Sequence, residues 1–312
     1  MVRKAVIEIG TNSIKFCIAE KTADGSIVFI KDVSRITKLG AGMGGSGEIS
    51  ADRAELNAQT VACFAEEAKR AQAREIKVVG TMALRSASNA SMFAKMVKEA
   101  AGVEVRILSG EEEAALSYDA VVRSIEGADG PVLMFDTGGG STEFVSGDGG
   151  AIIQIVSLGI GAVSVTERFF PDTPVPAESL ERAMSEISGT LAGSGIRRDK
   201  DSLLVGTGGN VTAMASVKQG MVSYDREKTH GSCLTLTEVR SQIESYAAKT
   251  LLERRRIKGL DPERAEIILA GACIVEAIML SFGFHELTVS DRGLRHGLMY
   301  RLFGLSARGP CC

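Results

Sequence analysis

The sequence contains no tryptophan, and aromatic residues make up only 5% of its 312 residues. Surfaces that bind single-stranded nucleic acid stack bases on aromatic side chains, so this composition disfavours such a surface. There is also no excess of positive charge, since the formal net charge is −3 and the pI is about 5.8. We therefore expect no nucleic-acid partner, and any polyanion must be bound by a local group of cations and backbone amides.

Apolar runs long enough for a targeting or membrane segment are also lacking. The first ten residues, MVRKAVIEIG, hold only a short apolar patch before Glu8, shorter than the apolar region of a signal peptide. The most apolar late stretch, CIVEAIMLSFGF, is interrupted by Glu276 and falls short of a bilayer span. The sequence predicts no membrane association and a cytoplasmic location.

The residues that usually bind transition metals or form disulfides show no suitable spacing. The three histidines are dispersed and form no metal cluster. A nucleotide-binding P-loop is excluded as well, because there is no G-K-[S/T] sequence. The cysteines lack paired ligand spacing. We expect a frayed tail at Cys311 and Cys312, and reduced thiols in the core at Cys17, Cys63, Cys233 and Cys273.

Strands alternate with helices along most of the chain. Three strands joined by turns are expected in the first forty residues, followed by helices and strands in turn up to residue 125, with Ser50 as a candidate N-cap. Turn-forming residues cluster at 126–131, and a second run of strands and helices begins at Val132. This order predicts an α/β fold of mixed sheets flanked by helices. The domains are expected at 1–126 and 127–312, with the last helix able to pack back on the first domain.

The second half repeats the pattern of the first. A shift of 128 residues (136 minus 8) superimposes acid-x-Gly-x-x-Ser-x-x-Phe of residues 8–16 on the same pattern at 136–144. A shift of 126 (204 minus 78) places VVGT at 78–81 on LVGT at 204–207. We interpret this as a duplication, in which each domain presents one hairpin loop and one strand-end loop to a shared cleft.

The loop LMFDTGGGSTEF (133–144) sets two acids around three glycines. Its successive amides can form a concavity that binds an anion, with contacts from Gly138, Gly139, Gly140 and Ser141. Asp136 and Glu143 flank the loop on opposing strands, where hard oxygen ligands suit Mg²⁺ or another divalent cation. A glycine hairpin flanked by surface acids is the structural alternative.

The equivalent loop of the first half, IEIGTNSIKF, adds polar side chains. Anion contacts are expected from Gly10, Thr11, Asn12, Ser13 and Lys15, although each residue is also an ordinary turn residue.

Two loops that follow the ends of strands are also candidate phosphate sites. In VVGTMALRSASNA a helix begins after the strand and carries Arg85, whose guanidinium suits phosphate; a surface ion pair is the alternative. The second loop is the better candidate for a nucleotide or a distal phosphate, with contacts expected from Gly206, Gly208, Gly209 and Asn210.

The three glutamates of ILSGEEEAALSY have different expected roles. Ser109 and Glu112 fit a capping box, which makes Glu112 structural. Glu113 lies about 100° further round the helix, at the edge of its apolar stripe, where a carboxylate could orient or deprotonate a water molecule. Separately, the run RRR at 254–256 is expected to be a solvated helix face or a surface that gathers polyanions.

Taken together, these motifs resemble the exopolyphosphatase and guanosine-pentaphosphate phosphatase family, which belongs to the actin-like ATPase superfamily with its duplicated ribonuclease H-like fold. The resemblance spans about residues 3–303. It implies that Glu113 activates water, that Asp136 and Glu143 are the metal-side acids, and that Arg85 is the family's arginine. The matching segments are VIEIGTNSIKF, RITKLGAGM, VVGTMALRSASN, ILSGEEEA, FDTGGGSTEFV, LVGTGGN and VSDRGLRHGL.

Three residues depart from the family pattern. Glu8, a further metal-side acid, stands where aspartate is usual, and Lys15 and Lys38 stand where arginine is usual. Lysine keeps the charge but loses the bidentate fork, so substrate preference is affected more than reaction class. The helical extension of long family members is also missing from the sequence.

The sequence therefore predicts an enzyme that hydrolyses terminal phosphoanhydride bonds of inorganic polyphosphate and releases orthophosphate, with Mg²⁺ as cofactor. Two alternatives stay open, a guanosine pentaphosphate (pppGpp) 5′-phosphohydrolase and an actin-like small-molecule kinase. A homodimer is suggested by analogy alone.

Overall fold

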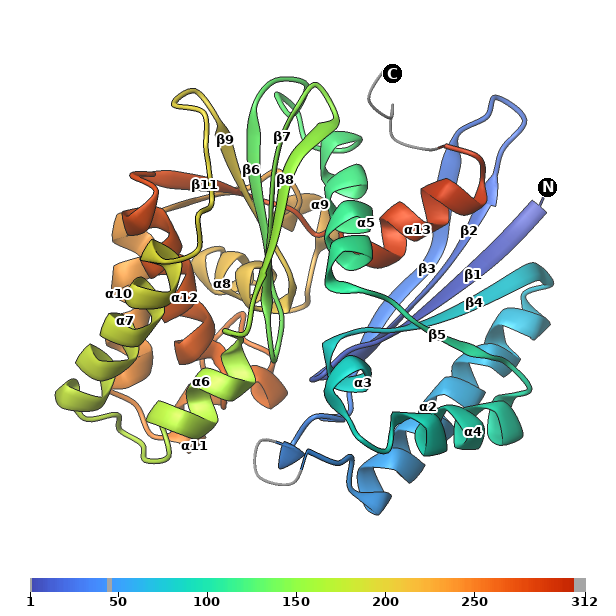
Figure 1. Cartoon of the computed structure of the whole chain (residues 1–312), viewed down its shortest axis with the longest axis horizontal. Coiled ribbons are helices and arrows are strands. Elements are labelled where there is room, and N and C mark those ends of the chain that lie inside the picture. Colours follow the sequence, from blue (N-terminus) through green and yellow to red (C-terminus); the bar gives the residue numbers. More distant parts are fainter. Residues whose placement is uncertain (1, 44–46, 306–312) are drawn as a thin grey trace. The chain divides into compact units, whose positions relative to one another are not determined.

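The computed structural model describes residues 2–43 and 47–305, which form two units (Figure 1). The first unit contains residues up to Ala120 together with the stretch from Leu294 onward, and the second unit runs from Val121 to Gly293. The last helix of the chain therefore belongs to the first unit. Cys311 and Cys312 lie outside the described residues.

The first unit is built on a five-stranded mixed sheet with the order β3-β2-β1-β4-β5. Strands β1, β2 and β3 are antiparallel neighbours, whereas β4 runs parallel to β1 and β5 parallel to β4. The elements of this unit are β1 (Val2–Ile9), β2 (Ser13–Lys21), β3 (Ile27–Ile36), α2 (Ala51–Arg70), β4 (Ala73–Gly80), α3 (Met82–Ser86), α4 (Ala90–Ala101), β5 (Val105–Ile107), α5 (Gly110–Val122, whose last two residues enter the second unit) and α13 (Leu294–Leu302).

Side chains alternate between the two faces of this sheet, as the period of a strand requires. On β1, Ile7 and Ile9 join the apolar cluster formed with α2 and α4, two helices that pack against each other. Val6 on β1 and Cys17 on β2 point to the other face and pack against Met299 of α13. Both faces of the sheet are therefore covered by helices, and α13 covers β1 and β2.

The second unit repeats the topology of the first. Its six-stranded sheet has the order β10-β11-β9-β6-β7-β8, so that β8-β7-β6-β9-β11 corresponds to β3-β2-β1-β4-β5, with β10 added antiparallel at the edge. The elements are β6 (Val132–Thr137), β7 (Thr142–Asp148), β8 (Ala151–Leu158), α6 (Ala162–Phe169), α7 (Ala177–Ala192), β9 (Leu203–Thr207), α8 (Gly209–Lys218), α9 (Arg226–Thr229), β10 (Cys233–Thr235), α10 (Leu236–Ala247), α11 (Leu251–Arg254), the 3₁₀ turn η1 (Pro262–Arg264), α12 (Ile268–Ser281) and β11 (Glu286–Val289).

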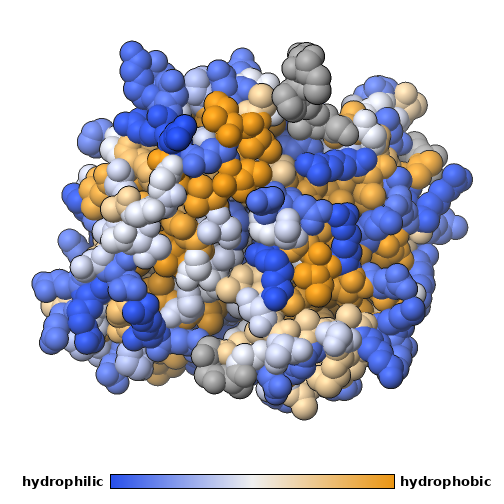
Figure 2. Space-filling model, viewed as in Figure 1, coloured by the Kyte–Doolittle hydropathy of each residue, from blue (hydrophilic) through white to orange (hydrophobic). Residues whose placement is uncertain are grey.

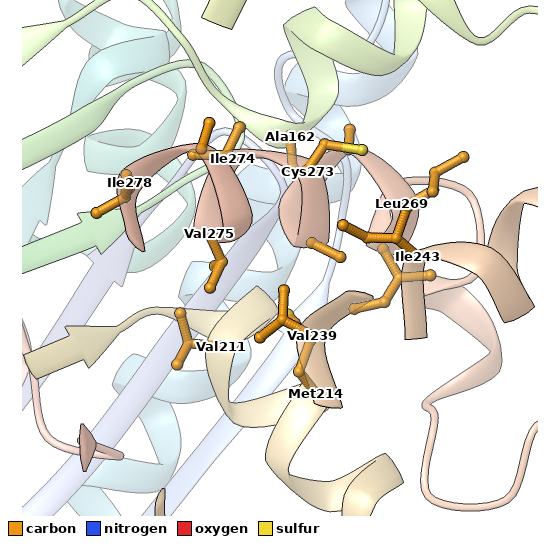
Figure 3. Close-up of a cluster of buried hydrophobic side chains, with 14 of the residues drawn as sticks. Ala162, Val211, Met214, Val239, Ile243, Leu269, Cys273, Ile274, Val275 and Ile278 are labelled. Atoms are coloured by element: carbon orange, nitrogen blue, oxygen red, sulfur yellow. The ribbon is translucent and has the colours of Figure 1, made fainter. Parts of the chain in front are cut away.

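Helix α12 occupies the centre of the second core. It is apolar almost all round and contacts α6, α7, α8 and α10. Figure 3 shows Val275 pointing toward Val211 of α8, while Ala162, the first residue of α6, lies beside Ile274 and Cys273. The start of α6 is thereby fixed to the core, which matters for the glycine loop described below.

The expected fold class is confirmed, and three details are corrected. Cys17 and Cys273 are buried as expected, but Cys63 is exposed on α2 and Cys233 is only partly buried. The run AIIQIVSLGIG (151–161) predicts one continuous strand, but β8 ends at Leu158 and α6 begins at Ala162. Strand β10 was not predicted, because an edge strand of three residues has too short a pattern to recognise.

On the face seen in Figure 2, hydrophilic residues predominate along the outline and apolar atoms are exposed between them. The exposed apolar side chains of the whole structure include Val222, Ile153 and Leu252. None of the helices in the described ranges is both long enough and apolar enough to cross a membrane.

Candidate functional site

The two glycine-containing hairpin turns have the same backbone geometry. In the first unit the amide of Gly10 donates to the carbonyl of Ser13 over 3.0 Å, and in the second the amide of Gly138 donates to the carbonyl of Ser141 over 2.9 Å. The last paired residues on either side correspond as well, Ile9 with Ile14 and Thr137 with Thr142. The sequence repeat is therefore a repeat of local structure.

In the second unit, the carbonyls of the glycine turn are bound by the first amides of α6. Ala162 donates to Gly138 over 3.0 Å, and Val163 and Ser164 donate to Gly139 over 2.8 and 3.2 Å. In a trans peptide the N–H points opposite to the preceding C=O. The amides that follow these carbonyls therefore point away from α6, as a turn that binds an anion requires.

In the first unit, amides of a loop rather than of a helix bind the carbonyls of the turn. Thr37 and Lys38 both donate backbone N–H groups to the carbonyl of Asn12, over 3.0 and 2.9 Å, and Gly40 donates to the carbonyl of Thr11 over 2.9 Å. Lys38 has φ +49°, a left-handed conformation that is uncommon for lysine. This support for the turn was not predicted in either unit.

Two glycines allow the close approach that these turns need. A Cβ on Gly161 would lie 2.5 Å from the carbonyl carbon and oxygen of Gly139, so only glycine fits between α6 and the turn. Gly208 has φ +96°, and a Cβ there would lie 2.7 Å from Oδ1 of Asp136. The strand-end loop of the second unit is thus packed directly against a predicted metal ligand.

Asp136 and Glu143 face each other across β6 and β7, as predicted. Glu143 is buried, and its Oε1 accepts a hydrogen bond of 3.0 Å from Ser157 Oγ, whereas Asp136 is partly exposed. Such a pair of hard oxygen donors fits Mg²⁺, which keeps several of its water molecules when bound. Within the described ranges, no group of three or more histidine, cysteine, aspartate or glutamate side chains is placed so that it could hold a metal ion.

Glu8 occupies the position of Asp136 in the first unit and faces Lys15, whose Nζ donates to Oε1 over 2.7 Å. Burial by itself would raise the pKa of Glu8, but the charges of Lys15 and, next, Arg295 and His296 lower it below its ordinary value. Its other oxygen, Oε2, is buried and has no hydrogen-bond partner among the described residues. An ionised carboxylate with one uncommitted oxygen can accept a water molecule or a cation.

Arg85 and Glu113 lie together in the first unit. Arg85 Nη1 donates to Glu113 Oε2 over 2.7 Å and to the carbonyl of Leu108 over 3.0 Å, and both side chains are largely buried. The capping box is present, with Ser109 N to Glu112 Oε2 at 3.0 Å and Glu112 N to Ser109 Oγ at 3.1 Å. Glu112 is therefore structural, which leaves Glu113 on the same helical turn to face Arg85. Helix α3, which carries Arg85, is a single turn, so its dipole adds little.

In the strand-end loop at 206–210, two residues that were predicted to contact phosphate, Gly209 and Asn210, have structural roles. The side-chain amide of Asn210 is buried and donates to the carbonyl of Thr137 over 3.3 Å, which ties this loop to the end of β6. Gly209 lies beneath the guanidinium of Arg264, since a Cβ there would be 2.3 Å from Nη1. Arg264 was not recognised in the sequence, because only the fold brings it from residue 264 to this loop.

These features define a duplicated actin-like fold whose paired turns are suited to phosphate groups. A family model described as the Ppx/GppA phosphatase family matches residues 17–305, and the chain belongs to that family. The family and the fold expected from the sequence are thereby confirmed.

Solved structures agree. A family member from Aquifex aeolicus is 32% identical, with 96% of this chain and 97% of that chain covered and a TM-score of 0.82. An exopolyphosphatase-like protein is 25% identical, with coverages of 96% and 97% and a TM-score of 0.89. An exopolyphosphatase from Cytophaga hutchinsonii shows the same fold at 24% identity, with coverages of 98% and 99% and a TM-score of 0.88.

Proposed function

We propose that the protein is an exopolyphosphatase, which hydrolyses the terminal phosphoanhydride bond of inorganic polyphosphate and releases orthophosphate. The observation that carries this proposal is the Arg85–Glu113 pair in a member of a phosphatase family. A hydrolase needs a carboxylate that orients water, whereas a kinase must keep water away from its phosphoryl donor. The pair therefore favours hydrolysis over the kinase alternative.

In the proposed reaction, Glu113 accepts a hydrogen bond from the attacking water and takes up its proton as the oxygen bonds to the terminal phosphorus. The bridging P–O bond breaks, and the shortened polyphosphate leaves with the electron pair. Arg85 orients Glu113 and stabilises the negative charge on the phosphoryl oxygens. Phosphoryl transfer needs mainly placement and charge stabilisation, so few groups suffice.

Each unit offers one turn of backbone amides for phosphate, Gly10–Ser13 in the first unit, with Lys15 as a cation beside it, and Gly138–Ser141 in the second. Asp136 and Glu143 would hold a divalent cation in the second unit, and Glu8 is the corresponding acid of the first unit. The ion would neutralise charge on the terminal phosphoryl group. The donor set supports Mg²⁺, because carboxylate oxygens and retained water are its usual ligands.

One assay tests the proposal. Phosphate release is measured with short polyphosphate, long polyphosphate, pppGpp and ATP, each with Mg²⁺ and without an added phosphoryl acceptor. We expect release from polyphosphate with the highest kcat/KM. If only pppGpp is hydrolysed, the enzyme is a pppGpp 5′-phosphohydrolase. If phosphate transfer appears only when an acceptor is added, the kinase alternative replaces our proposal.

A further inference from the structure

One strongly charged segment of the second unit plays no part in the site described above. The basic segment, defined here as residues 249–258 (KTLLERRRIK), contains five cationic residues and a single acid, Glu253, in a chain whose net charge is −3. A positive charge this concentrated is neutralised within the fold, solvated by water and counter-ions, or offered to a polyanion.

The three consecutive arginines have different environments. Arg254, the last residue of α11, is buried, with 1% of its surface exposed, and its Nε donates to the carbonyl of Tyr246 over 2.6 Å. Because this arginine anchors the turn in the core, the next residues of the segment project outward. Arg255, Arg256 and Lys258 are all exposed.

The exposed cations have one acidic neighbour, Glu253, whose pKa is lowered mainly by hydrogen bonds from Thr250 and to a smaller extent by the charges of Lys249 and Arg256. No ion pair joins Arg255, Arg256 or Lys258 to an acidic side chain within residues 2–43 and 47–305. The one acid of the basic segment, Glu253, is occupied by the cap of α11, since its Oε2 accepts from both N and Oγ1 of Thr250, over 2.8 and 2.7 Å. Three cationic side chains are therefore directed to solvent from one short turn.

Helix α8 connects this turn to the strand-end loop at 206–210. The side chain of Lys258 lies 3.9 Å from where a Cβ of Gly220 would be, next to the last turn of α8. At the other end of α8, Arg264 covers Gly209 beside the strand-end loop. The ten residues of α8 span about 15 Å, so the basic turn lies roughly that far from the loop along one helix.

We propose that Arg255, Arg256 and Lys258 bind a distant stretch of a long polyphosphate chain whose end is being hydrolysed. The proposal rests on the function proposed above. Unpaired guanidinium groups bind phosphates through charge-assisted, often bidentate hydrogen bonds. A second contact on the same chain raises the local concentration of its end, so it benefits only chains long enough to span both places.

The test removes the three charges together, as Arg255→Gln, Arg256→Gln and Lys258→Gln in the full chain. We expect KM for long polyphosphate to rise at least about tenfold, with kcat and short-chain kinetics unchanged. The matched control is Arg74→Gln, Arg197→Gln and Lys200→Gln, three exposed residues elsewhere that remove the same charge. This control should leave long-chain KM unchanged, whereas an equal rise in both triple variants would overturn the proposal.

A binding measurement separates failure of this proposal from failure of the proposed function. Calorimetric titration of the wild type and both triple variants with long polyphosphate is repeated with single-stranded DNA of similar charge. If polyphosphate binds tightly only when the basic turn is intact but only pppGpp is hydrolysed, the proposed function fails, while binding of polyphosphate by the basic turn is supported. Equal affinity of the basic-turn variant and the wild type for long polyphosphate, or equal binding of DNA at the same salt concentration, would refute it.

Discussion

Glu113 is the residue on which the proposed chemistry depends most directly. Glutamine keeps the size of the side chain but cannot take a proton from water. We expect Glu113→Gln to lower kcat on polyphosphate by about 10²–10⁴, with little change in KM, because a general base acts in the transition state. Glu111→Gln, an exposed neighbour on the same turn of α5, is the control and should retain activity. Full activity of Glu113→Gln would show that another group activates water.

We expect His230 to make the stability of the second unit depend on pH in the mildly acidic range. Its Nε2 lies 3.0 Å from the carbonyl of Ser124, and its Nδ1 accepts a hydrogen bond of 3.3 Å from the amide of Asp291. The neutral ring, protonated on Nε2, satisfies both contacts, whereas a proton on Nδ1 would face the N–H of Asp291. Burial, and to a smaller extent the charge of Arg292, lowers the pKa of His230 below its ordinary value.

This shift predicts a loss of stability as pH falls. The unfolded chain takes up a proton at His230 near pH 6.5, but the folded chain resists it, so the free energy of unfolding decreases as pH falls below that value. We expect His230→Gln to flatten this pH dependence between about pH 7.5 and 5 in chemical denaturation. His285→Gln, at an exposed histidine, should leave the slope as in the wild type. An unchanged slope for His230→Gln would contradict the assignment.

At the scale of elements, α6 is the support of the glycine turn. Gly161→Ala would push a methyl group against the carbonyl of Gly139 and displace the turn from the amides of α6. We expect kcat/KM to fall by up to about 10², because small misplacements of binding groups have effects of this size. Overpacking should also destabilise the protein by about 1–3 kcal/mol.

Gly189→Ala is the control for the effect of adding a methyl group to a glycine. Gly189 lies inside α7, and a Cβ there meets nothing within 4 Å. Gly189→Ala should therefore raise the free energy of unfolding by about 0.5–1 kcal/mol and leave activity unchanged. If Gly161→Ala behaves in the same way, the turn does not depend on close contact with α6.

Local turns and caps of this protein could be predicted from its sequence, whereas contacts fixed by packing could not. The hairpin turns, the strand-end loops and the capping box of α5 are local, so turn residues and periodicity reveal them. The amide donors at Ala162 and Lys38 were missed, because short polar or glycine-rich segments carry no periodicity and their partners are fixed only by packing. Arg85 and Glu113 were each recognised, but their contact arises from the ends of β4 and β5 lying side by side in the sheet.

Helix α13, which comes late in the chain, completes the first unit by packing on β1 and β2. Arg295, in the first turn of α13, donates to both carboxylate oxygens of Asp32 on β3, over 2.8 and 3.3 Å, and His296 Nε2 lies 2.8 Å from Oδ2. All three side chains are at most 7% exposed. Residues more than 260 positions apart are thus joined in one buried ionic cluster, beside the face of the sheet that carries Glu8.

This cluster predicts strong coupling between α13 and the first strands of the chain. Replacing Arg295 by Met leaves the carboxylate of Asp32 buried without its main counter-ion, which should cost about 3–5 kcal/mol. Lys98→Met, which breaks the exposed Lys98–Glu104 pair of the same unit, should leave the free energy of unfolding nearly unchanged.

The double variant Asp32→Asn/Arg295→Met removes both charges, so it should be more stable than the sum of the single variants predicts. Because the chain consists of two compact units, the measurement is hydrogen exchange resolved by peptide, which follows each unit by itself. We expect Arg295→Met to accelerate exchange in β1, β2 and β3 and to leave β6, β7 and β9 unchanged, since α13 packs on the first sheet. Additive effects of the two substitutions, or equal acceleration in both sheets, would show that α13 is not held to its sheet by this ion pair.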